Sequence, residues 1–359
     1  MSNDEQKGLA ERVSEPNVPE EVMKDISVLE QQFIRAEVEQ LRHSILSFRP
    51  LLEKRAKIIS HPDVQVNFWV RVLSNAPAEI DEYITSADAA ILGSGLKNLT
   101  VERFEVNEKG EGEPRSIRLT FEFNTDKGAN PFFENEKLVK EFYWRKQVFT
   151  TASGKKRTWD GLVSEPVRIN WKKDMDITKG LLDAACDLFE AEKKGGDRTK
   201  LPEFKKLVEK LAEVESLEED GEDDEEEYPL NRQSSGTFFR FFGYRGGDVT
   251  AEQSATATKE EQEKFEKLLN GENVEDDEAD DDEEVDDDFD MIEVFPDGSE
   301  LAIAIAEDLW PNALKYYVQS FEEPADFDED DFDDDEDEED EEDDANEIAQ
   351  LRPRKKTKV

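Results

Sequence analysis

The stretch that decides the fold is residues 21–60, EVMKDISVLEQQFIRAEVEQLRHSILSFRPLLEKRAKIIS. It contains no glycine, and its apolar residues recur every three or four positions, which is the spacing of one face of a helix. The spacing slips near residues 33–38 and then resumes, as in a coiled coil with a phase shift. The stretch predicts one long helix over residues 21–61, kinked at Pro50 because proline cannot donate a helical hydrogen bond.

A helix of this length predicts self-association. About 39 residues extend roughly 58 Å at 1.5 Å per residue, and a narrow apolar stripe of that length is normally buried against another helix. We therefore expect a homodimer, with two shorter helices in an ordinary bundle as the alternative. The expected dimerisation residues are Val22, Ile26, Leu29, Phe33, Val38, Leu41, Ile45, Phe48 and Leu52.

After this helix the period changes from about 3.6 to 2. Ile117, Leu119, Phe121 and Phe123 alternate with polar residues, as in a half-buried antiparallel strand. Together with three neighbouring segments they predict a meander of four strands, at residues 100–106, 116–123, 138–149 and 166–171. Amphipathic helices are expected at residues 181–193 and 203–217, and a short aromatic helix at residues 237–242, which Ser235 could cap. The fold class is therefore α+β.

The charge of the chain is concentrated in three runs. The 359 residues include 93 Asp and Glu against 46 Lys and Arg, a net charge of -47. Residues 218–227, 272–290 and 326–344 hold 40 of these acids and no base, so the rest is close to neutral. Runs of like charge cannot bury enough apolar surface to offset the entropy of ordering. We expect a domain over residues 62–321, with disorder at residues 1–20, 218–232, 246–293 and 322–359.

Three acidic runs in one chain indicate a polycationic partner, although a run can also serve solubility alone. A basic protein that binds such a run releases its condensed counterions, so association depends steeply on salt. Phe289, Phe327 and Phe332 interrupt the acid and could anchor in apolar dimples of the partner, unless they are incidental. The expected binding residues of the tail are Asp326, Phe327, Asp328, Glu329, Asp330, Asp331, Phe332, Asp333, Asp334 and Asp335.

The end of the chain reverses the sign of its charge. Arg354, Lys355, Lys356 and Lys358 form a basic cluster that is typical of a nuclear-import signal. The cluster predicts a nuclear protein that can shuttle with the cytoplasm, and an import receptor as a partner. The alternative is that the cluster folds back onto the acidic tail. A second basic run, residues 155–157, is expected at the tip of a hairpin.

Several classes of protein are excluded by what the sequence lacks. Cys186 is the single cysteine, and there are two histidines, which excludes a disulfide scaffold and a His/Cys metal cluster. No phosphate-binding glycine motif or nucleophile elbow occurs. We therefore expect no catalytic residues, no cofactor and no metal. The acidic balance argues against sequence-specific binding of nucleic acid, and the apolar run 301–306 is too short to cross a membrane.

Five segments, in order along the chain, resemble the nucleosome assembly protein family and most closely its SET branch. The most specific is DLWPNALKYY at residues 308–317. The other segments are residues 48–55 with 67–69, 130–135 with 138–142, 169–172 as the end of the fourth strand, and 235–242. The sequence departs from the SET pattern at residues 180–231 and 243–295.

The resemblance implies an antiparallel dimer through the long helix, and an "earmuff" domain whose four-stranded sheet has helices on one side. It also implies core histones as partners. The function expected is that of a histone chaperone, which shields histones from DNA and assists nucleosome assembly and disassembly. One alternative is an acidic regulator of the SET type that inhibits a phosphatase or masks histone tails from acetyltransferases, with histone-modifying enzymes as partners. A calcium buffer is disfavoured by the folded body and the basic end.

Overall fold

The computed structural model describes residues 18–124, 130–150, 154, 156–219, 236–272 and 292–322. The chain divides into two units, Met1–Phe321 and Glu322–Val359, and the elements below all belong to the first. The expected disorder at residues 1–17 and in the tail beyond residue 322 therefore lies outside the described residues.

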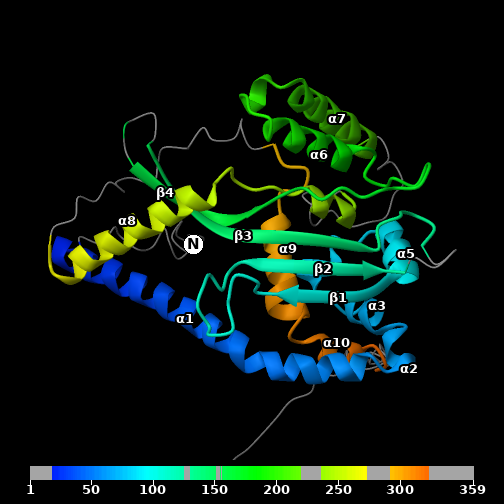
Figure 1. Ribbon diagram of the computed structural model, residues 1–359, viewed down its shortest axis with the longest axis horizontal. Coiled ribbons are helices and arrows are strands. Elements are labelled where there is room, and N and C mark those ends of the chain that lie inside the picture. Colours follow the sequence, from blue (N-terminus) through cyan, green and yellow to red (C-terminus); the bar gives the residue numbers. More distant parts are fainter. Residues whose placement is uncertain are drawn as a thin grey trace, which may run out of the picture. The chain divides into compact units, whose positions relative to one another are not determined.

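The long helix predicted from the sequence is present as α1, Glu20–Ile59, a single helix of 40 residues with Pro50 inside it. Figure 1 shows that α1 changes direction along its length. Pro50 has no N–H to donate to the preceding turn, which is the physical reason to expect a bend. Short helices then lead to the sheet: α2 (Pro62–Gln65), α3 (Phe68–Leu73), α4 (Ala78–Asp81) and α5 (Ser86–Gly95).

The sheet has four antiparallel strands in the order β1-β2-β3-β4. Their bounds are Leu96–Glu102, Ile117–Phe123, Lys137–Thr150 and Lys156–Ser164. The prediction of an antiparallel meander is confirmed, although β1 begins four residues before the expected start. Lys156 and Arg157 begin β4 opposite the end of β3, so this part of the second basic run lies at the hairpin as expected.

The predicted position of the fourth strand, residues 166–171, was wrong. This segment forms only an isolated bridge between Phe133 and Trp171. Ile169 is buried and Val167 is half-buried because the backbone lies against the aromatic helix η4, with Val167 N donating to Phe242 O at 2.8 Å. The true strand β4 was missed because most of it extends, with β3, beyond the end of β2. Residues 156–161 alternate there between exposed and half-buried, and none is a buried apolar residue that would mark a strand.

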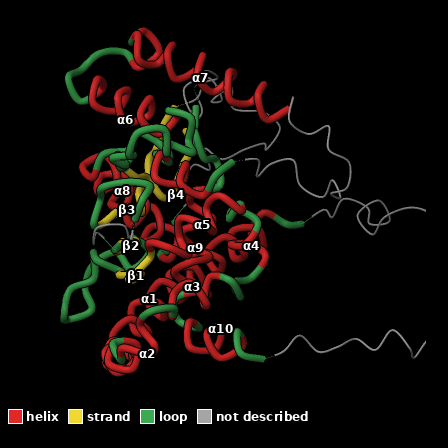
Figure 2. The backbone as a smooth tube through the Cα atoms, turned by 90° about the vertical axis from the view of Figure 1, so that its right-hand side faces the viewer, coloured by secondary structure: helices red, strands yellow, loops and turns green. Residues whose placement is uncertain are grey.

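The main core lies on one face of the sheet. Inward-facing residues of β2 and β3, such as Phe121 and Phe142, are fully buried. They meet the aromatic helix η4, Phe238–Gly243, through ring contacts of Phe121 with Phe238 and Phe242. Figure 2 shows the sheet from its side, with α3, α5 and α9 on one side of it. The expectation of helices on one side of the sheet is thus confirmed.

The aromatic helix is capped by a residue other than the one expected. Thr237 is its N-cap, and the Thr237 hydroxyl accepts a hydrogen bond from Phe239 N. Ser235 lies outside the described residues. All four phenylalanines of this helix are buried: Phe238, Phe239, Phe241 and Phe242. Their rings point in different directions around the helix, so all four can be buried only because the core surrounds the helix.

A second, smaller core holds the helical hairpin of α6 (Leu181–Glu192) and α7 (Pro202–Glu219). Both amphipathic helices were predicted, and α7 extends to residue 219, into the insert expected at residues 218–232. Residues 220–235 lie outside the described part of the chain. Arg198, in the short helix η3 (Arg198–Lys200) between them, pairs with Glu192 of α6 at 3.2 Å and so ties the connection to α6.

The insert expected to be disordered over residues 246–293 contains a helix. Residues Ala251–Leu269 form α8, whose start is a capping box between Thr250 and Gln253. The prediction failed because acid dominates only the second half of the insert, whereas residues 251–269 alternate charge and bury Ala257 and Phe265. Residues 273–291, including Phe289, lie outside the described residues.

The last part of the first unit, after the second acidic run, is divided among three elements. These are α9 (Gly298–Ala304), the π-helix η5 (Ile305–Leu309) and α10 (Ala313–Gln319). Leu301, Ile305, Leu309 and Ala313 are almost fully buried in the main core. No helix within the described ranges is long and apolar enough to cross a membrane.

Candidate functional site

Most of the residues expected to bind a cationic partner are not placed by the structure. The ten tail residues 326–335, Phe289 and the basic cluster at residues 354–358 all lie outside the described residues. The expected dimerisation residues, by contrast, all lie on α1. They define the candidate site.

The two halves of the α1 stripe have different surroundings. In the first half Val22, Ile26, Leu29 and Phe33 are 42–62% exposed. In the second half Val38, Leu41, Ile45 and Leu52 are half-buried and, with Phe48, face the body of the same chain. The phase shift near residues 33–38 is the reason, because it turns the second half toward β1 while the first half points away from that strand.

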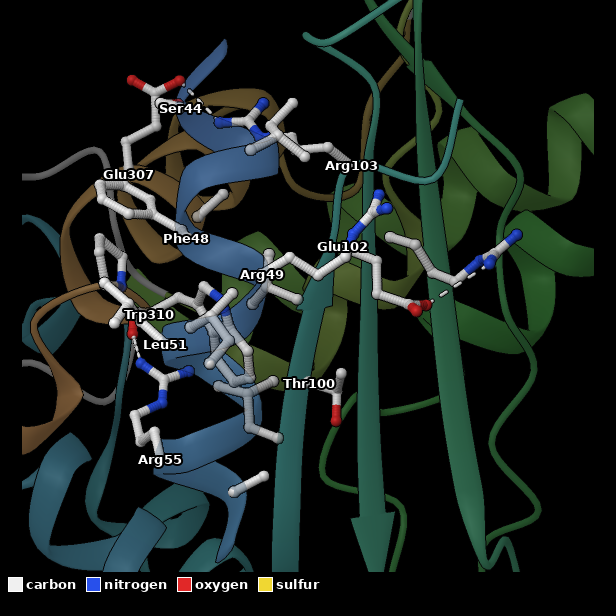
Figure 3. Close-up of a pocket in the computed structure, with 18 of the residues that line it drawn as sticks. Ser44, Phe48, Arg49, Leu51, Arg55, Thr100, Glu102, Arg103, Glu307 and Trp310 are labelled. Atoms are coloured by element: carbon white, nitrogen blue, oxygen red, sulfur yellow. Dashed lines mark hydrogen bonds and ion pairs between the residues drawn. The ribbon is translucent and has the colours of Figure 1, made fainter. Parts of the chain in front are cut away.

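The second half of α1 forms one wall of a groove of about 1400 Å³. Figure 3 shows the groove, with Phe48, Leu51 and Arg55 on the helix and Thr100 and Glu102 on the neighbouring strand β1. The segment from η5 to α10, including Trp310 and Leu314, completes the lining. The groove is therefore built from parts of the chain that are far apart in the sequence.

The loop between β1 and β2 fixes α1 at the groove. Arg42 donates from its guanidinium to Gly112 O at 3.0 Å. Gly110 has φ +83 and lies so close to Leu46 that an added Cβ would meet the leucine at 2.8 Å. A side chain at position 110 would thus be both strained and in collision, which explains the glycine.

Arg55 is a buried cation in the groove wall. It is 6% exposed, lies 4.0 Å over the ring of Trp310 and donates to Trp310 O. Its Nη2 has no hydrogen-bond partner, and no carboxylate of the described residues pairs with the guanidinium. Burial lowers the pKa of Arg55 to about 10. A carboxylate that entered the groove would find an unused donor there.

The charges of the groove contrast with those of the whole chain. Three of its cations are neutralised locally. Arg103 pairs with Glu307 at 2.9 Å, Arg115 with Glu113 at 2.7 Å, and Arg118 with Glu141 at 2.7 Å. The lining nonetheless holds six bases, Arg49, Arg55, Lys97, Arg103, Arg115 and Arg118, against four acids, Glu37, Glu53, Glu102 and Glu307. A groove with an apolar floor and a basic excess fits an amphipathic helix of acidic character.

The first half of α1 has this character. Residues Glu20–Phe33 carry the exposed apolar stripe together with four acids and one lysine. Residues 49–59, in the second half, carry four bases and one acid. Antiparallel pairing of two copies would place the acidic half of one helix in the basic groove of the other, whereas parallel pairing would place like charges together.

Sequence reasoning missed the groove as such, because Leu99, Trp310 and Arg55 reach it only through the tertiary fold. No local signal marked Arg55, because Ala56 continues the apolar stripe between Leu52 and Ile59 at the helical spacing. In the described ranges no group of three His, Cys, Asp or Glu is placed to hold a metal ion.

Comparison with known proteins identifies the family. The family model of the nucleosome assembly protein (NAP) matches residues 62–320, so the chain belongs to the nucleosome assembly protein family. The match begins just after α1 ends.

The chain is 29% identical over 311 residues to a putative nucleosome assembly protein of Schizosaccharomyces pombe, covering 87% of this chain and 84% of the relative. It is also 29% identical to protein SET of Drosophila melanogaster over 134 residues, 37% of this chain and 42% of the relative.

Solved structures of similar proteins include that of Ccp1, which is 26% identical, with a TM-score of 0.48 and coverage of 85% of this chain and 98% of the other. The structure of Vps75 is 19% identical, with a TM-score of 0.45 and coverage of 84% and 98%. Membership of the family supports a role in nucleosome assembly and a place in chromatin.

Proposed function

We propose that this protein is a homodimeric histone chaperone that binds core histones through its acidic segments, shields them from DNA and assists nucleosome assembly and disassembly. The observation that carries the proposal is the family match over residues 62–320. The segregation of charge supports it, because the acids outside the three runs nearly balance the bases while the runs hold 40 acids without a counter-charge.

The proposed mechanism is competitive shielding. A core histone is a polycation that precipitates with DNA when the two are mixed directly at low salt. Acidic segments occupy the basic surface of the histone and later yield it to the denser polyanion, the DNA duplex. The exchange needs no nucleotide and no covalent step, so the protein acts as a chaperone rather than as an enzyme.

Self-association gives this mechanism its scaffold. In the proposed dimer, the exposed stripe of Glu20–Phe33 from one copy lies in the groove beside α1 of the other, and a carboxylate of the incoming helix reaches Arg55. Burial of Val22, Ile26, Leu29 and Phe33 stabilises the dimer by about 1.5–3 kcal/mol for each fully buried side chain. A dimer presents two sets of acidic segments to one histone pair, which raises their effective concentration.

The experiment that tests the proposal uses the full chain with each of the two refolded core-histone pairs. We expect sedimentation of the chain as a dimer, binding of at least one histone pair at about 0.15 M salt, and rescue of histone–DNA mixtures from precipitation. A chain that binds neither pair under these conditions, where the Debye length is about 8 Å, would refute the proposal. A chain that binds histones without rescuing the mixtures, yet inhibits a purified phosphatase or acetyltransferase, would favour a SET-type regulator.

The basic cluster Arg354, Lys355, Lys356 and Lys358 is proposed to direct nuclear import. Replacement of these four residues by Ala in a fluorescent fusion is expected to leave the protein in the cytoplasm. Unchanged nuclear accumulation would show that another segment directs import.

A further inference from the structure

The helix α8 lies within residues 243–295, where the sequence departs from the SET pattern, and the proposed function does not use it. Its position is nevertheless specific. It lies between two elements that are otherwise separate, the protruding half of β3 and the first half of α1.

On one side α8 is anchored to the sheet. Strand β2 begins at Ile117, opposite Phe142, so the part of β3 beyond Phe142 has a ladder with β4 only. Helix α8 covers this open edge. The backbone N–H of Lys146 donates to Ser254 Oγ at 3.0 Å, and Lys146 Nζ pairs with Glu261 at 2.6 Å and with Asp160 of β4 at 3.4 Å. Ala257 is 3% exposed at the same contact.

On its other side α8 contacts α1. The guanidinium of Arg35 lies 4.1 Å over the ring of Phe265, and Arg35 Nη1 donates to Gln262 at 2.6 Å. Phe265 is 9% exposed. Figure 1 shows α8 approaching the first half of α1 with its C-terminal end.

The exposure of α1 marks which face α8 covers. Between Glu20 and Arg35, four residues are half-buried and recur at helical spacing: Lys24, Val28, Gln31 and Arg35. All other residues of this part are exposed. The dimerisation stripe lies on nearly the opposite face of the helix. Helix α8 therefore leaves the stripe free. Its contact with α1 does not cover the residues expected to form the dimer.

From these contacts we infer that α8 is a buttress that holds the first half of α1 in the orientation in which a second copy can receive it. The inference rests on the proposed self-association through α1. A helix of about 15 residues without tertiary contacts is only marginally stable in water. Because α8 joins this half of α1 to the sheet, the helix is ordered before association, and the dimer does not have to supply the ordering free energy.

The test is Phe265→Ala in the full chain, a change that removes the ring beneath Arg35 without altering the stripe. We expect faster hydrogen exchange over residues 20–35 and a dimer dissociation constant raised at least tenfold in sedimentation equilibrium. Lys146→Met, which releases the opposite side of α8, is expected to act in the same direction. Phe265→Tyr keeps an aromatic face for Arg35 and is expected to restore both readouts.

The matched control is Phe204→Ala, which removes the same ring from the peripheral helix α7, where Arg198 lies over it at 5.9 Å. It is expected to leave both the exchange of α1 and the dimer unchanged. The inference is overturned if Phe265→Ala speeds exchange in α1 without weakening the dimer, or if it leaves that exchange unchanged. A wild-type chain that is monomeric would instead refute the proposed function, and hydrogen exchange would still report whether α8 orders α1.

Discussion

At the scale of single residues, the stability of this fold depends on polar groups that are buried with their partners. Asp88 is fully buried at the start of α5 and accepts hydrogen bonds from two segments that are 150 residues apart. Its carboxylate caps α5 through Thr85 N at 2.9 Å and Thr85 Oγ1 at 2.6 Å. It also accepts from Thr237 Oγ1 and from Phe238 N, at the start of the aromatic helix η4.

Replacement of Asp88 by Ala is expected to lower the free energy of unfolding by about 3 kcal/mol, because it leaves buried donors unpaired and removes a helix cap. Urea unfolding followed by tryptophan fluorescence measures the loss. The control is Asp81→Ala, at an exposed aspartate of α4. Equal stability of the two variants would show that Asp88 does not join the two helices energetically.

Lys140 is another fully buried polar residue. Its ammonium donates to the carbonyl oxygens of Glu165 at 2.7 Å, Phe242 at 3.2 Å and Tyr244 at 2.5 Å. These bonds tie β3 to the aromatic helix and to the segment after β4. Burial lowers the pKa of Lys140 to about 7, because removal from water penalises the charge and no carboxylate of the described residues pairs with it directly.

This pKa predicts a pH dependence of stability. Between about pH 7 and the ordinary lysine pKa of 10.5, the unfolded chain binds a proton that the folded chain lacks, so the free energy of unfolding rises with pH. From pH 7 to 9 the gain is about 2 kcal/mol. Chemical unfolding across this range is expected to show the rise in the wild type and in Lys173→Met, and to lack it in Lys140→Met. Parallel profiles of all three would contradict the low pKa.

At the scale of elements, α1 shows how one sequence pattern can serve two purposes. The apolar stripe has a helical period throughout, yet its first half is exposed and its second half lines the groove. The slip at residues 33–38 separates the two faces. An uninterrupted heptad pattern would have placed both halves of the stripe on one face of the helix. That face could then contact either the body or a second copy, but one half could not contact the body while the other half contacts the second copy.

Phe33 is the most exposed of the stripe residues, at 62%. Replacement by Asp is expected to weaken the dimer about 100-fold, because it removes an aromatic contact and buries a carboxylate against the apolar floor of the groove. Gln32→Asp adds the same charge at an exposed position away from the stripe and is expected to have little effect. Sedimentation velocity over a concentration series distinguishes the two variants. A Phe33→Asp chain that remains fully dimeric would show that the first half of α1 does not bind in the groove of the second copy.

At the scale of the whole molecule, charge is divided between a nearly neutral body and three polyanionic runs. This division separates folding from binding. The body can bury its apolar residues without a large electrostatic cost, and the runs keep their carboxylates available because they contain no bases with which to pair. Binding through such runs is sensitive to salt, whereas the packing of the body is not.

Replacement of the acids in residues 326–344 by the corresponding amides is expected to weaken histone binding and to flatten its salt dependence. The slope of log K against log salt reports the number of counterions released, so fluorescence titrations at several salt concentrations measure both effects. The matched variant is Phe327→Ala with Phe332→Ala, which keeps every charge and should lower affinity with the slope unchanged. Histone affinity that is unaltered in this variant would refute the role of the two phenylalanines as anchors.

The sequence by itself determined the long helix, the antiparallel meander, the separation of acidic runs from a neutral body, and the family. Each of these follows from local periodicity, from composition or from short segments such as residues 308–317. Such local patterns can be recognised in the sequence before the tertiary structure is known. The position of β4, the order of residues 251–269 and the groove were decided only by the tertiary structure. In each case the deciding contact joins residues far apart in the chain: Val167 lies against Phe242, Arg35 against Phe265, and Arg55 against Trp310. A residue that is buried by a distant segment need not belong to any periodic pattern of apolar residues. These features therefore follow from tertiary packing alone.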